Sequence, residues 1–280
     1  MIRSAITLSL VAEARGGPFV FWDGLEDGCT RAAAFGFDAV EIFPPAANAL
    51  DANELKIILA RHTLQLAAIG SGAGWVKHKL RLTDPDMAIR REAISFVTAL
   101  IDLAGPLGAP TIIGSMQGRW GDGISREQAM IWLAEALEEL GKRAARYNTP
   151  LLYEPLNRYE TNLFTRVAEA RAFLGPLRAQ NILLLCDLFH MNIEEQDIPS
   201  ALRLAGEKLG HVHFADSNRQ AAGFGHTDFS AIARALRAMN YRGYASAEIL
   251  PLPDSDAAAQ QTIQSFRRWF PNPADDLEAN

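Results

Sequence analysis

Residues that can bind a divalent metal recur along the second half of the chain. Glu154, Asp187, His213 and Glu248 are separated by 33, 26 and 35 residues. Three carboxylates that meet in one place raise each other's pKa unless a positive charge lies among them. We therefore predict that these four side chains hold one divalent ion. Oxygen ligands with a single imidazole favour manganese, magnesium or cobalt over structural zinc, which prefers Cys and His.

The third of these residues lies in the segment LGHVHFADSN (209–218), which reads as a buried strand. Residues two apart in a strand point to the same side, so His211 and His213 share one face while Val212 and Phe214 share the other. The apolar face suits packing against helices. We expect His211 to be a buried neighbour of His213 rather than a metal ligand.

Strand and helix patterns alternate along the rest of the chain. Short β-rich runs cover residues 5–10, 38–43, 64–70, 110–115, 150–155, 182–188, 211–216 and 243–250. Each of these runs is followed by a helical pattern, for example over residues 51–62, 85–104, 125–147, 165–174, 199–205, 228–239 and 256–269. Eight alternating units without a linker or a break in composition predict a single-domain (β/α)8 barrel over residues 1–280.

The four candidate ligands fit this barrel because they stand at the ends of strands five to eight. Active sites of such barrels lie at the carboxyl ends of the strands, and units average about 31 residues. A doubly wound open sheet is the competing fold. It is disfavoured because the first strand–helix connection, with Gly16-Gly17-Pro18, lacks the G-x-G-x-x-G turn.

Composition excludes several classes of function. The 280 residues carry a net charge of −6, which argues against binding to nucleic acid or to anionic membranes. Two cysteines are too few for a disulfide framework or a Cys-based zinc site. We interpret the segment at residues 1–17 as a first strand rather than a signal peptide, and no apolar run reaches the ~18 residues of a membrane span. We expect a cytoplasmic protein.

Four segments of the second half resemble one family of enzymes. They are YEPLNRYETN (153–162), CDLFHMNIEE (186–195), HVHFADSNR (211–219) and SAEIL (246–250). They are similar to the ketose 3-epimerases of the D-tagatose and D-psicose 3-epimerase type, which are xylose isomerase-like barrels. The resemblance implies that Glu154, Asp187, His213 and Glu248 hold one metal ion, usually manganese. It also implies that Glu160, His190 and Arg219 bind the first oxygens of the sugar.

The resemblance implies C-3 epimerisation of a free ketose through a metal-bound cis-enediolate. Glu154 and Glu248 would flank the substrate, one removing the C-3 proton and the other returning a proton to the opposite face. Arg219 and His190 would hold O-1 and O-2, and Glu160 would accept a hydrogen bond from the C-1 hydroxyl.

The loops after the strands of the first half depart from the sequence pattern of this family. Trp75 and Trp120 are candidates for an apolar wall against the sugar carbons, or else aromatic anchors of the barrel rim. Phosphate sites of such barrels lie after strands seven and eight. There PLPDSD (251–256) offers neither glycine nor a basic residue, which favours a free sugar, whereas GFGH (223–226) offers backbone donors.

Other functions remain open at this point. The same site suits an aldose–ketose isomerase, a hydroxypyruvate-type isomerase or a lyase acting on a 3-oxo-sugar. Apurinic endonucleases share the barrel but need three zinc ions and a basic face, which six histidines and net charge −6 disfavour. A non-catalytic sugar-binding protein is the third class. The sequence leaves a homodimer and a homotetramer as alternatives.

Overall fold

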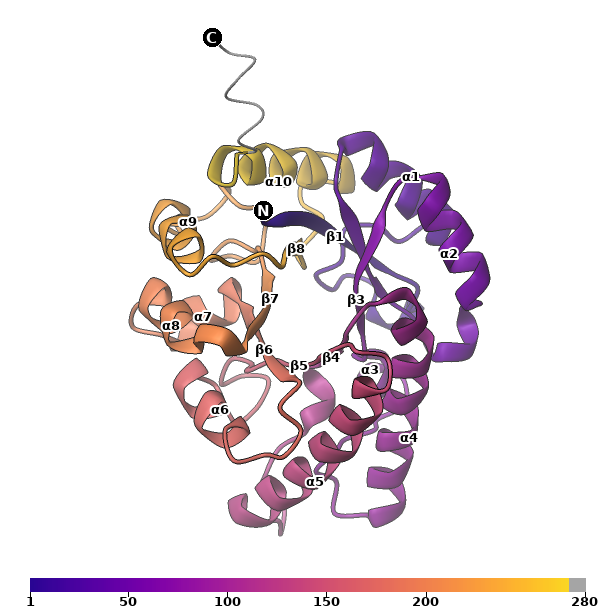
Figure 1. Ribbon diagram of the computed structural model, residues 1–280, viewed down its shortest axis with the longest axis vertical. Coiled ribbons are helices and arrows are strands. Elements are labelled where there is room, and N and C mark those ends of the chain that lie inside the picture. Colours follow the sequence, from indigo (N-terminus) through magenta and orange to yellow (C-terminus); the bar gives the residue numbers. More distant parts are fainter. Residues whose placement is uncertain (272–280) are drawn as a thin grey trace.

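Eight parallel strands follow one another round a closed barrel in chain order in the computed structural model, which describes residues 1–271 (Figure 1). β8 pairs with β1 and closes the ring. The strands are β1 Arg3–Ser9, β2 Ala39–Phe43, β3 Gln65–Gly70, β4 Thr111–Ile113, β5 Leu151–Tyr153, β6 Ile182–Asp187, β7 Leu209–His213 and β8 Tyr244–Ala247. The predicted (β/α)8 barrel is confirmed.

Helices surround the strands on the outside of the barrel (Figure 1). They are α1 Leu25–Phe35, α2 Ala52–Arg61, α3 Ala73–Val76, α4 Met87–Ala104, α5 Arg126–Ala145, α6 Val167–Leu174, α7 Leu188–Glu194, α8 Ile198–Ala205, α9 Phe229–Ala238 and α10 Ser255–Trp269. Short 3-10 helices are η1 Ala12–Ala14, η2 Ala47–Ala49, η3 Gly105–Leu107, η4 Ser115–Gln117 and η5 Gly206–Lys208. None of the helices within residues 1–271 combines the length and apolar character needed to cross a membrane.

No range was predicted from the sequence for three of these helices: α1, α3 and α7. The pattern of α1 is interrupted by Gly28, a poor helix former. This glycine is needed for packing, because a Cβ there would lie 3.0 Å from Cδ2 of Leu8. α3 has only four residues, and α7 follows β6 without any loop.

Aspartates mark the beginnings of six helices. In each case the carboxylate of the N-cap residue accepts a hydrogen bond from a free backbone N–H of the first turn, which stabilises a helix by about 1 kcal/mol. These residues are Asp51, Asp86, Asp187, Asp197, Asp228 and Asp254. Asp187 differs from the other five because only one of its carboxylate oxygens caps a helix, while the other lies in the candidate site.

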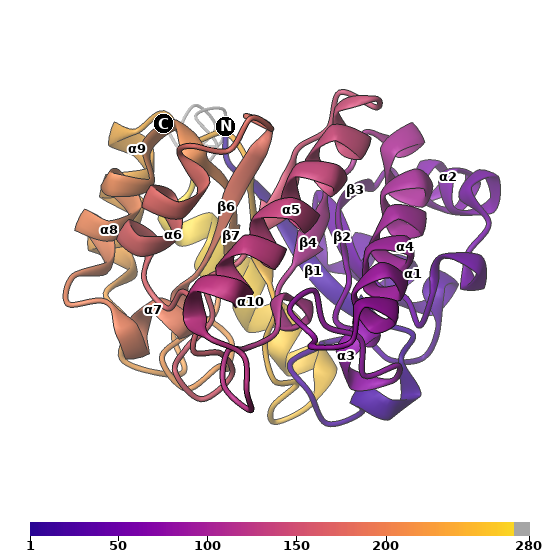
Figure 2. The same ribbon diagram turned by 90° about the horizontal axis from the view of Figure 1, so that it is seen from below.

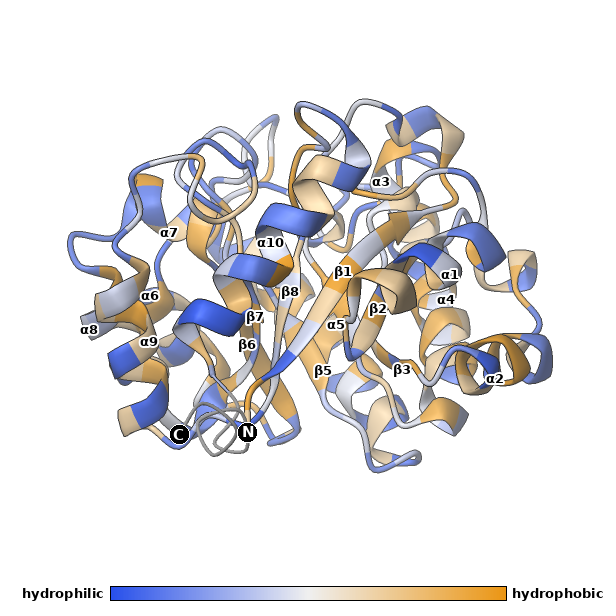
Figure 3. Ribbon diagram, turned by 90° about the horizontal axis from the view of Figure 1, so that it is seen from above, coloured by the Kyte–Doolittle hydropathy of each residue, from blue (hydrophilic) through white to orange (hydrophobic). Residues whose placement is uncertain are grey.

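Alternation along the strands separates the large apolar core outside the barrel from smaller buried groups. Val212 and Cys186 point outward into the apolar layer between barrel and helices. Inside the barrel a smaller group, Ala68, Ile112, Leu152 and Leu185, is buried. Figure 3 shows the apolar strands, with α3 and α7 at one end of the barrel and the start of β1 at the other. Figure 2 shows the same arrangement from the opposite edge, so the carboxyl ends of the strands share one face.

Candidate active site

Four ligand-type side chains meet at this face. Glu154 is the first residue after β5, Asp187 ends β6, His213 ends β7, and Glu248 is the first residue after β8. One ligand atom from each lies within 4.8 Å of the other three. The barrel thus brings together the four residues that were selected from the sequence.

The imidazole of His213 lies at the centre of the cluster. Its Nδ1 atom is 3.5 Å from Oε1 of Glu154 and 3.6 Å from Oδ2 of Asp187. Oε2 of Glu248 is also 3.6 Å away. Atoms that bind a common ion at about 2.1 Å are about 3–3.5 Å apart, so the spacing is close to that of a ligand set.

Buried polar atoms of the cluster lack partners. Among the described residues, Oε1 of Glu154, Oδ2 of Asp187 and Nδ1 of His213 have no hydrogen-bond partner. Leaving such atoms unsatisfied costs about 1–3 kcal/mol each, and more for charged groups. A divalent cation would satisfy all three at once. The residues present therefore fit a metal ion.

The charges of the cluster also indicate that a cation is required. Burial, with Glu248 and Asp187 nearby, raises the pKa of Glu154 to about 8. Burial also raises the pKa of Glu248. The pKa of Asp187 is lowered because His190 and His213 outweigh the effect of burial. Two buried acids thus ionise with difficulty, and a dication would favour their charged forms.

Glu41 in β2 lies behind this cluster and was missed by the sequence reasoning. Its carboxylate is fully buried. Nε2 of His213 lies 3.0 Å from Glu41 Oε1, and Nε2 of His211 lies 2.8 Å from Glu41 Oε2. His211 is therefore buried next to His213, as expected from the sequence. One charged residue within the apolar run AVEIF was the available signal, because a buried carboxylate requires partners.

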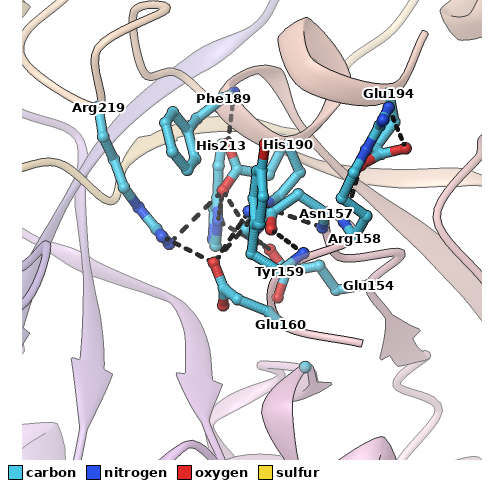
Figure 4. Close-up of polar contacts among 12 residues, drawn as sticks. Glu154, Asn157, Arg158, Tyr159, Glu160, Phe189, His190, Glu194, His213 and Arg219 are labelled. Carbon is cyan, nitrogen blue, oxygen red and sulfur yellow. Dashed lines mark hydrogen bonds and ion pairs between the residues drawn. The ribbon is translucent and has the colours of Figure 1, made fainter. Parts of the chain in front are cut away.

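Three further polar residues surround the cluster on its open side (Figure 4). His190 on α7 lies with Nε2 3.5 Å from Asp187 Oδ2. Glu160 and Arg219 come from the loops after β5 and β7, and Nη1 of Arg219 lies 3.4 Å from Oε1 of Glu160. The positions selected through the family resemblance thus lie together beside the four candidate ligands.

Arg219 is held in a strained backbone conformation. Its φ angle is +60°, in the left-handed region that non-glycine residues seldom adopt and that is found at functional sites. Nη2 donates to Glu248 Oε2 at 2.7 Å, and the guanidinium lies 4.8 Å from the centre of the Phe189 ring. Although burial opposes it, Glu248 and Asp187 raise the pKa of Arg219. A permanent cation therefore faces the acids.

A cavity of about 590 Å³ opens above the cluster. Glu154, Glu160, His190, Arg219 and Glu248 line its floor, and Trp75 belongs to the lining contributed by the first half of the barrel. The two tryptophans differ here. Trp120 is not among the residues that line the cavity; it is 40 % exposed, and its Nε1–H donates to the carbonyl of Asn162 at 2.7 Å.

The loop after β7 folds around a carboxylate of its own. Asp216 accepts hydrogen bonds from the backbone N–H groups of Ser217, Gly223 and Thr227. A Cβ at Gly225 would lie 2.3 Å from Asp216 Oδ1, so this close approach requires glycine. Within GFGH, the backbone N–H of Gly223 donates to Asp216, that of Phe224 to the carbonyl of Ala221 and that of His226 to Oγ of Ser217, so these three donors are already engaged within the loop.

Fold and site together define a class: a (β/α)8 barrel with a candidate metal centre at the carboxyl ends of its last four strands. The family model described as "Xylose isomerase-like TIM barrel" matches residues 29–269. The chain belongs to this family.

The individual relatives to which this chain is similar include several sugar epimerases. An L-ribulose 3-epimerase from Methylomonas sp. (strain DH-1) is 29 % identical over 272 residues, covering 94 % of this chain and 93 % of the relative. A 3-dehydro-D-guloside 4-epimerase from Escherichia coli (strain K12) is 39 % identical over 112 residues, 40 % of this chain and 43 % of the relative. A solved L-ribulose 3-epimerase structure matches with a TM-score of 0.81 and 26 % identity, over 100 % of this chain and 98 % of the other. The resemblance to ketose 3-epimerases is confirmed.

Proposed function

We propose that the protein is a metal-dependent ketose 3-epimerase, an isomerase that inverts C-3 of a free ketose. The observation that carries this proposal is the buried cluster of Glu154, Asp187, His213 and Glu248, with three of its ligand atoms lacking partners among the described residues. Two members of the cluster, Glu154 and Glu248, line the cavity. Similarity to named 3-epimerases supports the choice of reaction.

The four residues would hold one divalent ion. Three carboxylates with a single imidazole suit Mn²⁺ best, with Co²⁺ and Mg²⁺ as the alternatives. When bound, the ion would stabilise the negative charge that develops on the substrate oxygens after loss of a proton from the neighbouring carbon.

Glu154 and Glu248 would exchange the protons. They stand after β5 and β8, three strands apart, and both line the cavity. A sugar between them has one carboxylate on each face of C-3. One takes the C-3 proton, and the other delivers a proton to the opposite face, so the centre inverts without any change in oxidation state.

Three residues would orient the sugar. Arg219 and His190 would hold O-1 and O-2, and Glu160 would accept a hydrogen bond from the C-1 hydroxyl. Trp75 would contact the sugar carbons from the far side of the cavity. Fixing these atoms places only one carbon within reach of both carboxylates.

The test replaces the two carboxylates one at a time. Glu154→Gln and Glu248→Gln should each slow exchange of the C-3 proton with deuterated water by about 10²–10⁴-fold, the usual contribution of a placed general acid or base. NMR of D-fructose, D-tagatose and L-ribulose incubated with the Mn²⁺-loaded protein measures it. Glu139→Gln, at an exposed position of α5, is the matched control. Undiminished exchange in both variants would refute the mechanism.

A second candidate reaction is 4-epimerisation of a 3-oxo-sugar, which the similarity to the Escherichia coli 4-epimerase favours. The same carboxylates would then act at C-4, the carbon that follows the C-3 ketone, as C-3 follows the C-2 ketone in a ketose. Deuterium incorporated at C-4 of an oxo-sugar, with none at C-3 of the ketoses, would select this reaction. Product analysis of the same incubations separates both from aldose–ketose isomerisation, hydroxypyruvate-type isomerisation and β-elimination.

A further inference from the structure

His190 presents its two ring nitrogens to different surroundings (Figure 4). The side chain is 2 % exposed. Nδ1 faces Asn157, in the loop after β5, while Nε2 faces the cluster and has no hydrogen-bond partner among the described residues. Which nitrogen carries the proton decides what this ring can do for a substrate.

The orientation of the Asn157 amide answers that question. The backbone N–H of Tyr159 donates to Asn157 Oδ1 at 2.9 Å, and only the carbonyl oxygen of an amide can accept. The amide nitrogen, Nδ2, must therefore be the atom that lies 3.0 Å from Oε1 of Glu160. An ionised carboxylate accepts and does not donate, so this contact requires the same orientation.

Two donors of Asn157 then converge on one nitrogen of His190. Nδ2 lies 2.7 Å from Nδ1 of the ring, and the backbone N–H of Asn157 donates to the same atom at 3.3 Å. Nδ1 must therefore accept with its lone pair. In the neutral ring the proton is then on Nε2.

We infer that Asn157 is a positioning residue that holds His190 as the Nε2–H tautomer, so that the ring acts as a hydrogen-bond donor to an acceptor oxygen in the cavity. This inference deepens the proposed function, on which the identity of that oxygen rests. In a ketose, the acceptor that gains negative charge as the carbon proton leaves is the carbonyl oxygen. Donation to it strengthens as the charge develops, and the proton remains on Nε2 throughout.

Neighbouring contacts make the arrangement rigid. Glu194 at the end of α7 accepts from the backbone N–H of Arg158 at 2.7 Å and from Nε of Arg158 at 2.8 Å. The loop that carries Asn157 is thus tied to the same helix that carries His190 (Figure 4). Nε2 of His190 is left 3.5 Å from Asp187 Oδ2 and 3.8 Å from Glu154 Oε1, too far for a hydrogen bond of good geometry.

The experiment reads the tautomer directly. The full chain, labelled with ¹⁵N-histidine and loaded with diamagnetic Mg²⁺, is studied by NMR, and the His190 ring is assigned as the signal absent from His190→Gln. We expect the native ring to carry its proton on Nε2. Asn157→Asp keeps the shape of the side chain but replaces the Nδ2 donor with an acceptor, and should move the proton to Nδ1. Asn157→Ala adds no charge and keeps only the longer backbone contact at 3.3 Å, so the Nδ1–H tautomer should become populated beside the Nε2–H tautomer.

Controls separate positioning from a general effect on folding. Asn53→Asp, on the exposed face of α2, makes the same chemical change and should leave the His190 signal unmoved. A native ring protonated on Nδ1, or an Nε2–H tautomer that persists in both Asn157 variants, would overturn the inference. Since the tautomer is read without any sugar, absence of ketose turnover would refute the proposed function alone.

Kinetics supply a second readout. Loss of one donor to a developing oxyanion lowers kcat by about 10²–10³-fold. We expect Asn157→Asp to lower kcat for the ketose that the protein turns over by at least about tenfold with KM changed by less than about threefold. The affinity for Mn²⁺ should remain as in the native protein. A change confined to KM or to metal affinity would contradict a role through His190.

Discussion

His213 and His190 both lie beside Asp187, with ring nitrogens 3.6 and 3.5 Å from its Oδ2. Their other ring nitrogens face groups of opposite hydrogen-bonding character. Behind His213 stands the carboxylate of Glu41, which can only accept, so Nε2 of that ring carries a proton and Nδ1 faces the cluster. Behind His190 stand two N–H donors, so Nδ1 accepts and Nε2–H faces the cluster. One ring can offer a lone pair to a cation; the other offers a proton to an oxygen.

The electrostatics follow the same division. Although burial opposes it, Glu41 and Glu248 raise the pKa of His213 well above its ordinary value. Burial lowers the pKa of His190. A metal ion that binds Nδ1 of His213 must therefore displace a proton, whereas His190 remains neutral. The role of each ring is therefore determined by the group behind it, Glu41 for His213 and Asn157 for His190.

The largest effect should come from removing the ring expected to bind the ion. His213→Gln should weaken Mn²⁺ binding by more than about 100-fold, since the loss of a ligand exceeds the 10–100-fold typical for the loss of a group behind it. Calorimetric titration of the metal-depleted protein measures this. His190→Gln is the matched variant and should bind Mn²⁺ within about threefold of the native protein. Equal losses in the two variants would abolish the distinction between the rings.

Replacing His190, the second ring, should lower the rate of turnover rather than the affinity for the metal. His190→Gln, although it keeps the metal, should lower kcat for the responsive ketose by about 10²–10³-fold, the usual result of removing one donor to a developing oxyanion. Steady-state kinetics at saturating Mn²⁺ test this. A His190→Gln protein with native kcat would show that the ring only fills space between Phe189 and the cluster.

A smaller effect is expected at Glu41, which lies behind the first ring. Glu41→Gln keeps the size of the side chain but removes the charge that orients His213 and His211. We expect Mn²⁺ binding 10–100-fold weaker, as is typical of groups that support a metal ligand. His211→Asn should be milder, since His213 keeps its carboxylate. Native metal affinity in Glu41→Gln would mean that packing alone aligns His213.

These contrasts also show where reasoning from the sequence ends. The barrel and the four residues of the cluster were predictable, because strand periodicity and the spacing of Glu154, Asp187, His213 and Glu248 repeat the geometry of the fold. Glu41 was not, since it comes from β2, far from β7 in the sequence. Its place beside His211 and His213 depends on the ring closing so that β2 faces β7 across the barrel interior.

Asn157 was out of reach for a different reason. Its type and its place in the segment EPLNRYE fit a turn as well as a site, and asparagine is common in turns. Only the directions of its hydrogen bonds to Tyr159, Glu160 and His190 distinguish the two. Such directions depend on side-chain conformations that no spacing rule encodes.

The smallest expected effects test whether residues from the first half of the barrel also contact the substrate. Trp75 lines the cavity and Trp120 does not. If a sugar buries about 40 Å² of apolar surface on Trp75, at about 25 cal/mol per Å² its loss costs about 1 kcal/mol, or about a fivefold rise in KM. Trp75→Ala should show this rise with kcat unchanged, whereas Trp120→Ala should stay within about twofold. Equal rises in KM would place both tryptophans against the substrate and require the loop of Trp120 to turn inward.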